Sequence, residues 1–286
     1  MTRAPYQSLL RSCLLSAAAL ASLPVAGQEA DRAAPTLPTW QVLEYEQKAY
    51  FVTARSRVEI IPDTADDAHW HLTARSSVAS NFEEVTLKMN AGDGAALHRS
   101  RLSKGKQERY KTYDFLPRHI LRVRHDPTPK TALPPAQWPV SSRHKIPYPP
   151  AAKGMIVTDA YALLELTRRF LASDDASAEL VINTEFNFYR VRMSQTDDTP
   201  IKVNYQVAGS PEPISGKQQA RAVRVEVSPL GELAEKSDFS LLGLKSDITV
   251  LFDPDGKVPL QLRGEAPRIG KTEINLKILT PREATE

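Results

Sequence analysis

The sequence predicts a mainly β protein, in which a large curved antiparallel sheet forms an open half-barrel with one principal helix packed on it. Segments that alternate β-branched or aromatic residues with polar ones recur along most of the chain. Short turn sequences rich in glycine, proline and aspartate separate many of these segments. Only one stretch places apolar residues at helical spacing, which argues against a doubly wound α/β sheet, because that fold alternates strands with helices.

Residues 1–27 have the pattern of an export signal. Arg3 and Arg11 occur without an acidic residue, and an apolar run at residues 13–25 follows them. This run is too short to span a bilayer as a helix, and the small residues before Gln28 suit a signal-peptide cleavage site. We therefore expect a mature chain that begins near Gln28 and resides in the periplasm.

The composition argues against several classes of protein. The 286 residues carry 37 Lys and Arg against 34 Asp and Glu, and loss of Arg3 and Arg11 with the signal leaves a net charge of +1. A nearly neutral chain is not typical of a nucleic-acid-binding protein. The one cysteine, Cys13, lies in the signal, so disulfides and cysteine nucleophiles are not expected in the mature chain. The sequence shows no transmembrane segment after the signal.

Ordered structure is expected to begin at Trp40, after a leader at residues 28–39 whose alanine, proline and threonine content indicates disorder. From Trp40 the chain has the pattern of a meander, with turns at Gly92–Gly94 and at residues 104–106. The strands expected in this part of the chain cover residues 40–46, 49–61, 69–78, 84–89, 109–115 and 120–125.

Residues 127–150 are expected to form a long proline-rich loop. Proline has no backbone N–H to donate, and the repeated prolines of this segment argue against a central strand. Trp138 and Tyr148 supply apolar side chains that can fix part of the loop to the sheet.

The principal helix is predicted within residues 157–172. Thr158 or Asp159 can cap its N-terminus, and Leu163, Leu166 and Phe170 recur on one face. This apolar face is expected to pack on the concave side of the sheet. Phe170 is also a candidate contact for an apolar ligand held there.

Strands return after the helix, and a tight turn at residues 253–256 joins two of them. Each half of the chain has too few strands to close alone, so we expect one β-rich domain at residues 40–280. The strands expected in this part cover residues 179–193, 201–207, 220–227, 247–252, 258–263 and 273–278.

The sequence shows no catalytic motif, and it indicates no cofactor and no metal site. His69 and His71 share one face of a strand, but no further metal-ligating cluster accompanies them, so a metal site is the weaker interpretation. Adjacent carboxylates such as Asp197-Asp198 point to opposite faces of a strand, which makes them poor acid–base partners.

A basic cluster extends from Arg99 to Arg124, a segment that contains nine cationic residues and only two acidic ones. Arg122 and Arg124 share one face of a strand and are candidate ligands for a phosphate, a sulfated sugar or an acidic partner. The alternative is that these cations lie on a solvated outer face of the sheet, which is the usual place for a run of charged residues. The nine cations are Arg99, Arg101, Lys104, Lys106, Arg109, Lys111, Arg118, Arg122 and Arg124.

The C-terminal region resembles the end of a bacterial periplasmic family, domain of unknown function 3108. That family similarly ends with a strand and an acidic turn. A three-residue motif of lysine or arginine, any residue, and proline follows, and then a glycine and an Ile-Gly pair precede the last strand. The opening Leu43–Tyr45 and the helix that starts at Asp159 are also similar to it. The matching C-terminal positions are Asp253–Gly256, Lys257-Val258-Pro259, Gly264 and Ile269-Gly270.

The resemblance implies a fold and a location, with no catalytic residues to transfer. Its members look related to the curved sheets of lipoprotein-carrier proteins, which hold acyl chains in a half-barrel. We therefore expect a non-enzymatic periplasmic binding or carrier protein for an apolar or amphipathic envelope ligand, such as a lipid or a lipid-linked glycan. The alternatives are an assembly factor in envelope biogenesis that binds a protein partner, and a hydrolase with an unrecognised site.

Overall fold

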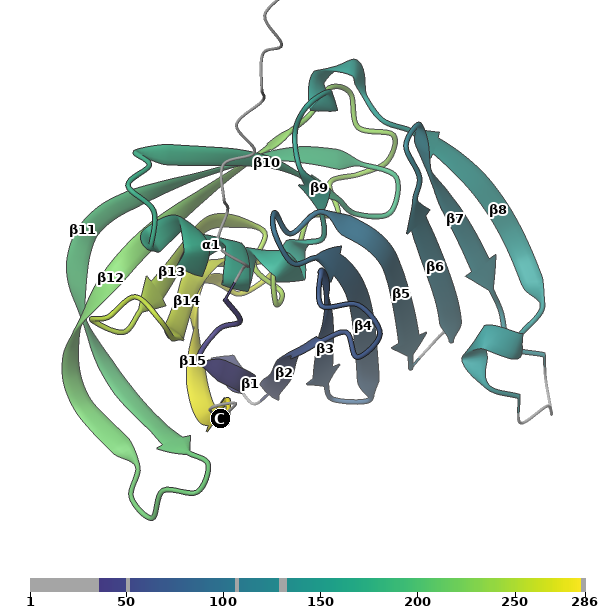
Figure 1. The fold of residues 1–286 in the computed structure, drawn as a ribbon. Helices are drawn as coiled ribbons and strands as arrows, with labels where there is room; N and C mark the ends of the chain where they lie inside the picture. Colours follow the sequence, from purple (N-terminus) through teal and green to yellow (C-terminus); the bar gives the residue numbers. More distant parts are fainter. Residues whose placement is uncertain (1–35, 50–51, 106–107, 129–132, 284–286) are drawn as a thin grey trace, which may run out of the picture. The chain divides into compact units, whose positions relative to one another are not determined.

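The computed structural model describes residues 36–49, 52–105, 108–128 and 133–283. The predicted signal and most of the predicted leader lie outside these residues. In the described part of the chain, fifteen strands form a single sheet that curves around a helical segment (Figure 1). The predicted mainly β fold with one principal helix is therefore confirmed, and a single sheet joins the regions before and after the helix.

The strands before the helix form a continuous meander in which each pairs with the next. Their bounds are β1 Trp40–Ala49, β2 Val52–Pro62, β3 His69–Val78, β4 Asn81–Asn90, β5 Ala96–Lys104, β6 Arg109–Phe115, β7 His119–His125 and β8 Val140–Pro147. The later strands are β9 Val157–Thr158, β10 Ser177–Asn183, β11 Phe188–Val207, β12 Ile214–Pro229, β13 Ser246–Phe252, β14 Pro259–Ala266 and β15 Gly270–Pro281.

Strand order across the sheet is β8-β7-β6-β5-β4-β3-β2-β1-β15-β14-β13-β12-β11-β10-β9. The first strand, β1, therefore pairs with the last, β15, and the backbone N–H of Arg282 donates to the Thr39 carbonyl at 2.8 Å. Neighbours are antiparallel except for β9 with β10, and β11 also pairs in parallel with β15 through residues 206–207 and 278–279. This second pairing closes β11–β15 into a ring, so the sheet is mixed rather than wholly antiparallel.

Alternation along the strands explains the core. In β3, Trp70, Leu72 and Ala74 are buried on the inner face while the residues between them are partly exposed. In β1, Leu43 and Tyr45 point the same way and are almost fully buried. The inner face of β1–β4 thus supplies a large apolar surface, which the helical segment covers.

Three strand predictions were wrong, each for a local reason. Residues 179–193 were expected to form one strand, but a turn at residues 184–187 separates β10 from β11. Strand β11 then runs through Asp197-Asp198, which the ladder accommodates as a register shift between Thr196 and Thr199. Strand β5 was not expected, because its sequence is too polar to show an apolar alternation.

The segment 127–150 is not a loop throughout, because it contains β8. Residues 140–146 include no proline, so every backbone N–H in that stretch can donate, and Pro139 and Pro147 fall at its ends. Strand β8 pairs only with β7 and lies at the edge of the sheet, where flanking prolines cost no central ladder bond.

The predicted helix is confirmed as α1, Leu163–Leu171, preceded by a 3-10 turn at Ala160–Ala162. The Asp159 carboxylate caps this turn by accepting a hydrogen bond from the Tyr161 N–H at 2.9 Å. Leu163, Leu166 and Phe170 are all buried in the main core, as the spacing predicted. Two further 3-10 turns lie at Pro135–Gln137 and Pro150–Ala152.

Charged groups also fix α1 to the sheet. The fully buried carboxylate of Glu165 accepts hydrogen bonds from Arg168 at 2.7 Å and from Arg169 at 2.8 Å. Arg169 in turn donates to the Ala91 carbonyl at 2.8 Å, and its guanidinium carbon lies 4.5 Å from the centre of a Trp70 ring. The helix is therefore part of the core rather than a mobile cover.

The substitution Phe170→Ala is expected to lower the free energy of unfolding by about 3–5 kcal/mol, because it removes a buried ring and leaves a cavity. Urea denaturation followed by circular dichroism measures this loss. Asp174→Ala, an exposed position just after the helix, should change the stability by no more than about 0.5 kcal/mol. Equal stability of the two variants would show that the Phe170 face is not packed on the core.

Candidate functional site

Most of the basic cluster lies on the inner face of the curved sheet; Lys104 and Arg118 are exposed, and Lys106 lies outside the described residues. Side chains on one face of neighbouring strands line up across the ladder, and the inner face of β5–β7 carries two rows of them. This placement differs from the solvated outer face that charge runs in general favour. The two rows are Arg99, Tyr113 and Arg122, and Arg101, Lys111 and Arg124.

Three of these cations are almost completely removed from water. Arg99, Lys111 and Arg122 are 3%, 5% and 3% exposed. An isolated charge at this depth is strongly unfavourable, so each cation requires a nearby acceptor or counter-charge. The acceptors come from a distant part of the chain, the turn between β10 and β11 together with the cap of the helical segment.

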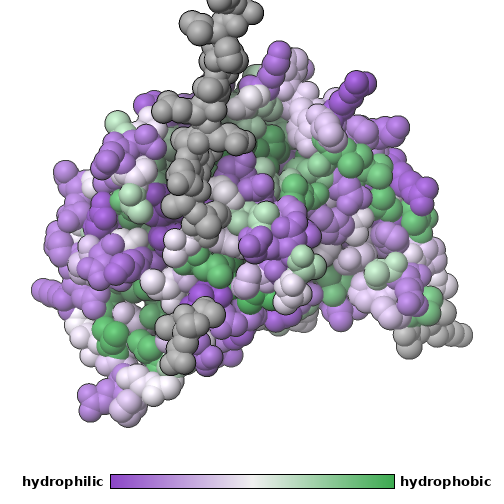
Figure 2. Space-filling model, in the orientation of Figure 1, coloured by the Kyte–Doolittle hydropathy of each residue, from purple (hydrophilic) through white to green (hydrophobic). Residues whose placement is uncertain are grey.

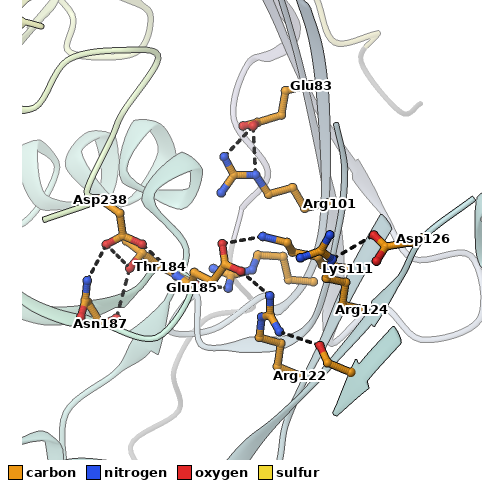
Figure 3. A network of polar contacts seen from close by, with 12 residues as sticks. Glu83, Arg101, Lys111, Arg122, Arg124, Asp126, Thr184, Glu185, Asn187 and Asp238 are labelled. Carbon is orange, nitrogen blue, oxygen red and sulfur yellow. Dashed lines mark hydrogen bonds and ion pairs between the residues drawn. The ribbon is translucent and has the colours of Figure 1, made fainter. Parts of the chain in front are cut away.

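Glu185, in the turn at residues 184–187, is the counter-charge for two of them. Its carboxylate accepts a hydrogen bond from Lys111 Nζ at 2.5 Å and a second from Arg122 Nη2 (Figure 3). The Arg122 guanidinium carbon also lies 4.6 Å from the ring centre of Phe186, the next residue of the same turn. The turn therefore docks onto β6 and β7.

Arg99 makes the parallel set of contacts from β5. Its guanidinium donates to the Asp159 carboxylate at 2.8 Å, to the Asn183 carbonyl at 2.6 Å, and to the Thr184 carbonyl. Its planar side chain stacks on the Tyr113 ring, with 3.8 Å between the guanidinium carbon and the ring centre. We call the group of Arg99, Lys111 and Arg122 with Asp159 and residues 183–185 the cationic clamp.

Asp238 holds the turn in the position that the clamp requires. One of its carboxylate oxygens accepts from Thr184 Oγ1 at 2.7 Å and from Asn187 Nδ2 at 3.0 Å (Figure 3). The other accepts from the Glu185 backbone N–H at 3.3 Å. Since β5–β7 and β10 are not neighbours in the sheet, the clamp joins two distant parts of it through side chains rather than through ladder bonds.

The clamp lowers the pKa of the Glu185 carboxyl. Burial alone would raise that pKa, but the hydrogen bonds and charges of Lys111 and Arg122 outweigh burial and bring it below the ordinary value. The pKa of Asp238 is lowered in the same way, since bonds from Thr184, Asn187 and the Glu185 backbone outweigh its burial. Both groups are therefore ionised at neutral pH.

A cavity of about 850 Å³ lies beside the clamp. One wall is the inner face of β2–β6, and the opposite wall comes from Tyr161 and from residues 238–245. The sheet side of the cavity includes a row of five side chains, one from each of β2–β6, that lie opposite one another across the ladder. The row begins with serines on β2 and β3 and ends with an arginine on β6. The members of this row are Ser56, Ser76, Glu83, Ser103 and Arg109.

The predicted site residues do not line this cavity. Arg122 belongs to the clamp, and Arg124 pairs with Asp126 at 2.9 Å at a partly exposed position. Phe170 is 4% exposed within the core. The structure therefore brings Arg122 and Arg124 onto one face, as predicted, but assigns Arg122 to closure of the sheet.

Sequence reasoning missed Glu185, Asp238 and Lys245. These residues lie in irregular segments, and no sequence spacing connects them to β5–β7, which precede them by more than fifty residues. Only the surplus of cations between Arg99 and Arg124 indicated that carboxylates elsewhere in the chain had to meet them.

The histidine pair has ordinary partners. His71 Nε2 lies 3.0 Å from the Asp63 carboxylate, which also accepts from Lys88 Nζ at 2.7 Å, and His69 lies 2.9 Å from Asp66. Within the described ranges, no group of three or more histidine, cysteine, aspartate or glutamate side chains is placed to hold a metal ion. None of the helices in that part of the chain has the length and apolar character needed to cross a membrane.

Glu185→Gln is expected to lower the free energy of unfolding at pH 7 by about 1–3 kcal/mol, because it weakens two charge-assisted hydrogen bonds. The native pKa of Glu185 lies below its unfolded value, so its stabilising effect is present above about pH 4.3 and is lost as the pH falls further. The difference between the variant and the parent should therefore shrink in acid. Urea titrations at several pH values measure it, with the exposed Glu212→Gln as control; a pH-independent difference would contradict the ionised clamp.

Comparisons with known proteins identify a fold and no family. No family model and no curated protein match the sequence. Among solved structures, the chain is similar to the crystal structure of a β-barrel-like protein of domain of unknown function DUF1849 from Brucella abortus. That comparison has a TM-score of 0.52 at 9% sequence identity and covers 88% of this chain and 100% of the other. At this identity the likeness shows the β-barrel-like fold alone, and the resemblance to domain of unknown function 3108 stays a prediction.

Proposed function

We propose that the protein is a non-enzymatic periplasmic binding or carrier protein that holds an amphipathic envelope ligand in the cavity beside the clamp. The observation that carries this proposal is the cavity itself. A volume of about 850 Å³ is within the range of cavities that hold small-molecule ligands. A solidly packed interior would have favoured the alternative of an assembly factor.

The walls of the cavity suit a ligand with both apolar and polar parts. Val85, Tyr161 and Leu242 contribute apolar surface, while three serines of the sheet contribute hydroxyl groups. On the face seen in Figure 2, hydrophobic residues lie in separate areas among hydrophilic ones, without one broad apolar surface. The cavity therefore fits an apolar moiety better than this face does.

The residues around the cavity also favour binding over hydrolysis. Among the lining residues that the structure describes, none is a histidine or a cysteine. Its carboxylates are occupied, since Glu83 accepts from Arg101 at 2.9 Å and Asp159 accepts from Arg99. A hydrolase requires a free base beside a nucleophile, and the described lining of this cavity supplies no such pair.

Export is the first test of the proposal. The charge and apolar pattern of residues 1–27 should direct the chain to the periplasm with removal of the signal. We expect an N-terminus near residue 28 when protein from a periplasmic extract is sequenced. Recovery of the chain in the cytoplasm with Met1 intact, or acylated at Cys13, would overturn the proposed location.

Ligand retention is the second test. Protein purified from a periplasmic extract without detergent should release an amphipathic compound on solvent extraction, which mass spectrometry detects. Ser103→Trp fills the cavity from β5 and should remove most of this compound. Ser100→Trp places the same ring on the opposite face of β5 and should retain it. Equal retention by the two variants, with both folded by circular dichroism, would sink the proposed binding site.

A further inference from the structure

We propose that the ligand of this cavity is an amphipathic anion, whose phosphate or carboxylate group binds to Arg109 and Lys245. This inference rests on the proposed function and specifies its ligand. It follows from the distribution of charge over the walls, from the donors that the protein leaves without acceptors, and from the change of polarity across the sheet.

The described carboxylates around the cavity all have direct protein partners, whereas some of the cations do not. Seven cations and four carboxylates either line it or bond directly to its lining, so cations exceed anions. Each carboxylate already has protein donors, namely Arg101 for Glu83, Arg99 for Asp159, the pair of Lys111 and Arg122 for Glu185, and the turn residues for Asp238.

Two cations of the lining, Arg109 and Lys245, have no such direct partner. In the described part of the chain neither makes a salt bridge or a side-chain hydrogen bond, although the Asp126 carboxylate interacts with Arg109 and the Asp238 carboxylate with Lys245 at longer range. They come from separate places in the sequence, at the start of β6 and in the segment before β13. Their convergence on one cavity leaves a surplus of positive charge, which the clamp does not neutralise.

Arg109 provides an independent indication. It lies opposite Ser103 in the row that forms the sheet wall. Its Nε atom is buried without a hydrogen-bond acceptor, as are those of Arg99 and Arg122, but the guanidinium groups of Arg99 and Arg122 are bonded through their other nitrogens. A buried donor without an acceptor is uncommon and unfavourable. An oxyanion beside this guanidinium can accept from the donors that the protein leaves unused.

Lys245 also lines the cavity, from the segment before β13. Burial lowers the pKa of Lys245, and the nearby Asp238 carboxylate opposes that effect. A partly buried ammonium group in this setting gains more from a bound anion than a solvated surface lysine does, because less water screens the interaction.

The sheet wall changes character from one side of the cavity to the other. Over β2 and β3 its side chains are small or apolar, as at Ala54, Ser76 and Val78. Strand β4 adds Glu83, which is paired with Arg101 of β5, and β6 adds the cation Arg109. A ligand that spans this wall meets apolar contacts at one end and positive charge at the other, which is the complement of an amphipathic anion.

The test compares ligands that differ only in the charged group. Isothermal titration calorimetry of the delipidated mature protein with decyl phosphate and with decanoate should show binding at least about tenfold tighter than with the neutral 1-decanol, in line with charge-assisted hydrogen bonds. Inorganic phosphate alone should bind much more weakly than decyl phosphate, because it makes no apolar contact. All compounds are used below the concentrations at which they form micelles.

Variants assign the effect to the cations. Arg109→Met and Lys245→Met should each weaken decyl phosphate binding about tenfold and leave 1-decanol binding unchanged. Arg118→Met and Lys217→Met remove the same charges at exposed positions outside the cavity and should have no effect. Circular dichroism checks that every variant is folded.

The possible results distinguish a failure of the proposed ligand class from a failure of the proposed binding function. If 1-decanol binds as tightly as decyl phosphate and Ser103→Trp blocks both, the protein is a carrier but the ligand is not selected by its charge, and this inference is wrong. If inorganic phosphate binds as tightly as decyl phosphate, the site recognises a free anion and the amphipathic class is wrong. If no alkyl compound binds and Ser103→Trp changes nothing, the proposed function fails with the inference.

Discussion

Glu185 lies between Lys111 and Arg122, two cations that would otherwise be buried without a counter-charge. Removal of one partner from a buried ion pair is far more unfavourable than the net gain of forming it. The β10–β11 turn and the inner face of β6–β7 are therefore bound to each other, although they share no ladder bond. That contact joins two distant parts of the sheet beside the cavity that residues 238–245 line from the other side.

Two kinds of closure thus coexist in one sheet. The ring of β11–β15 closes through backbone pairing, which is insensitive to side-chain identity and leaves little room to vary the enclosed space. The opposite part closes through side chains, with Tyr113, Ile120, Val181 and Phe188 packed beneath the charged groups. Single substitutions can change a closure made by side chains without altering the backbone pairing. The cavity lies next to this closure, which is the more adaptable of the two.

The sequence predicted most of the fold because turns and apolar alternation are local signals. Strand β5 and the break at residues 184–187 escaped, since β5 has polar residues on both faces and the break contains no glycine or proline. The candidate site was predictable only as a surplus of charge. Alternation shows that Arg122 and Arg124 share a face, yet it does not tell which face is the inner one. That choice depends on Glu185, which comes sixty-three residues after Arg122 and is identified only by the folded contact.

The pairing of β1 with β15 has a consequence for the order of folding. Ladder bonds between Trp40–Glu46 and residues 275–281 join the two ends of the described chain. Of the described strands, the first to leave the ribosome therefore has one of its edges unsatisfied until the last has been synthesised. Contacts of such sequence separation form slowly, because a very long loop must close first. A chain with this topology stays incomplete, and open to chaperones and to passage through a narrow pore, for the whole of its synthesis.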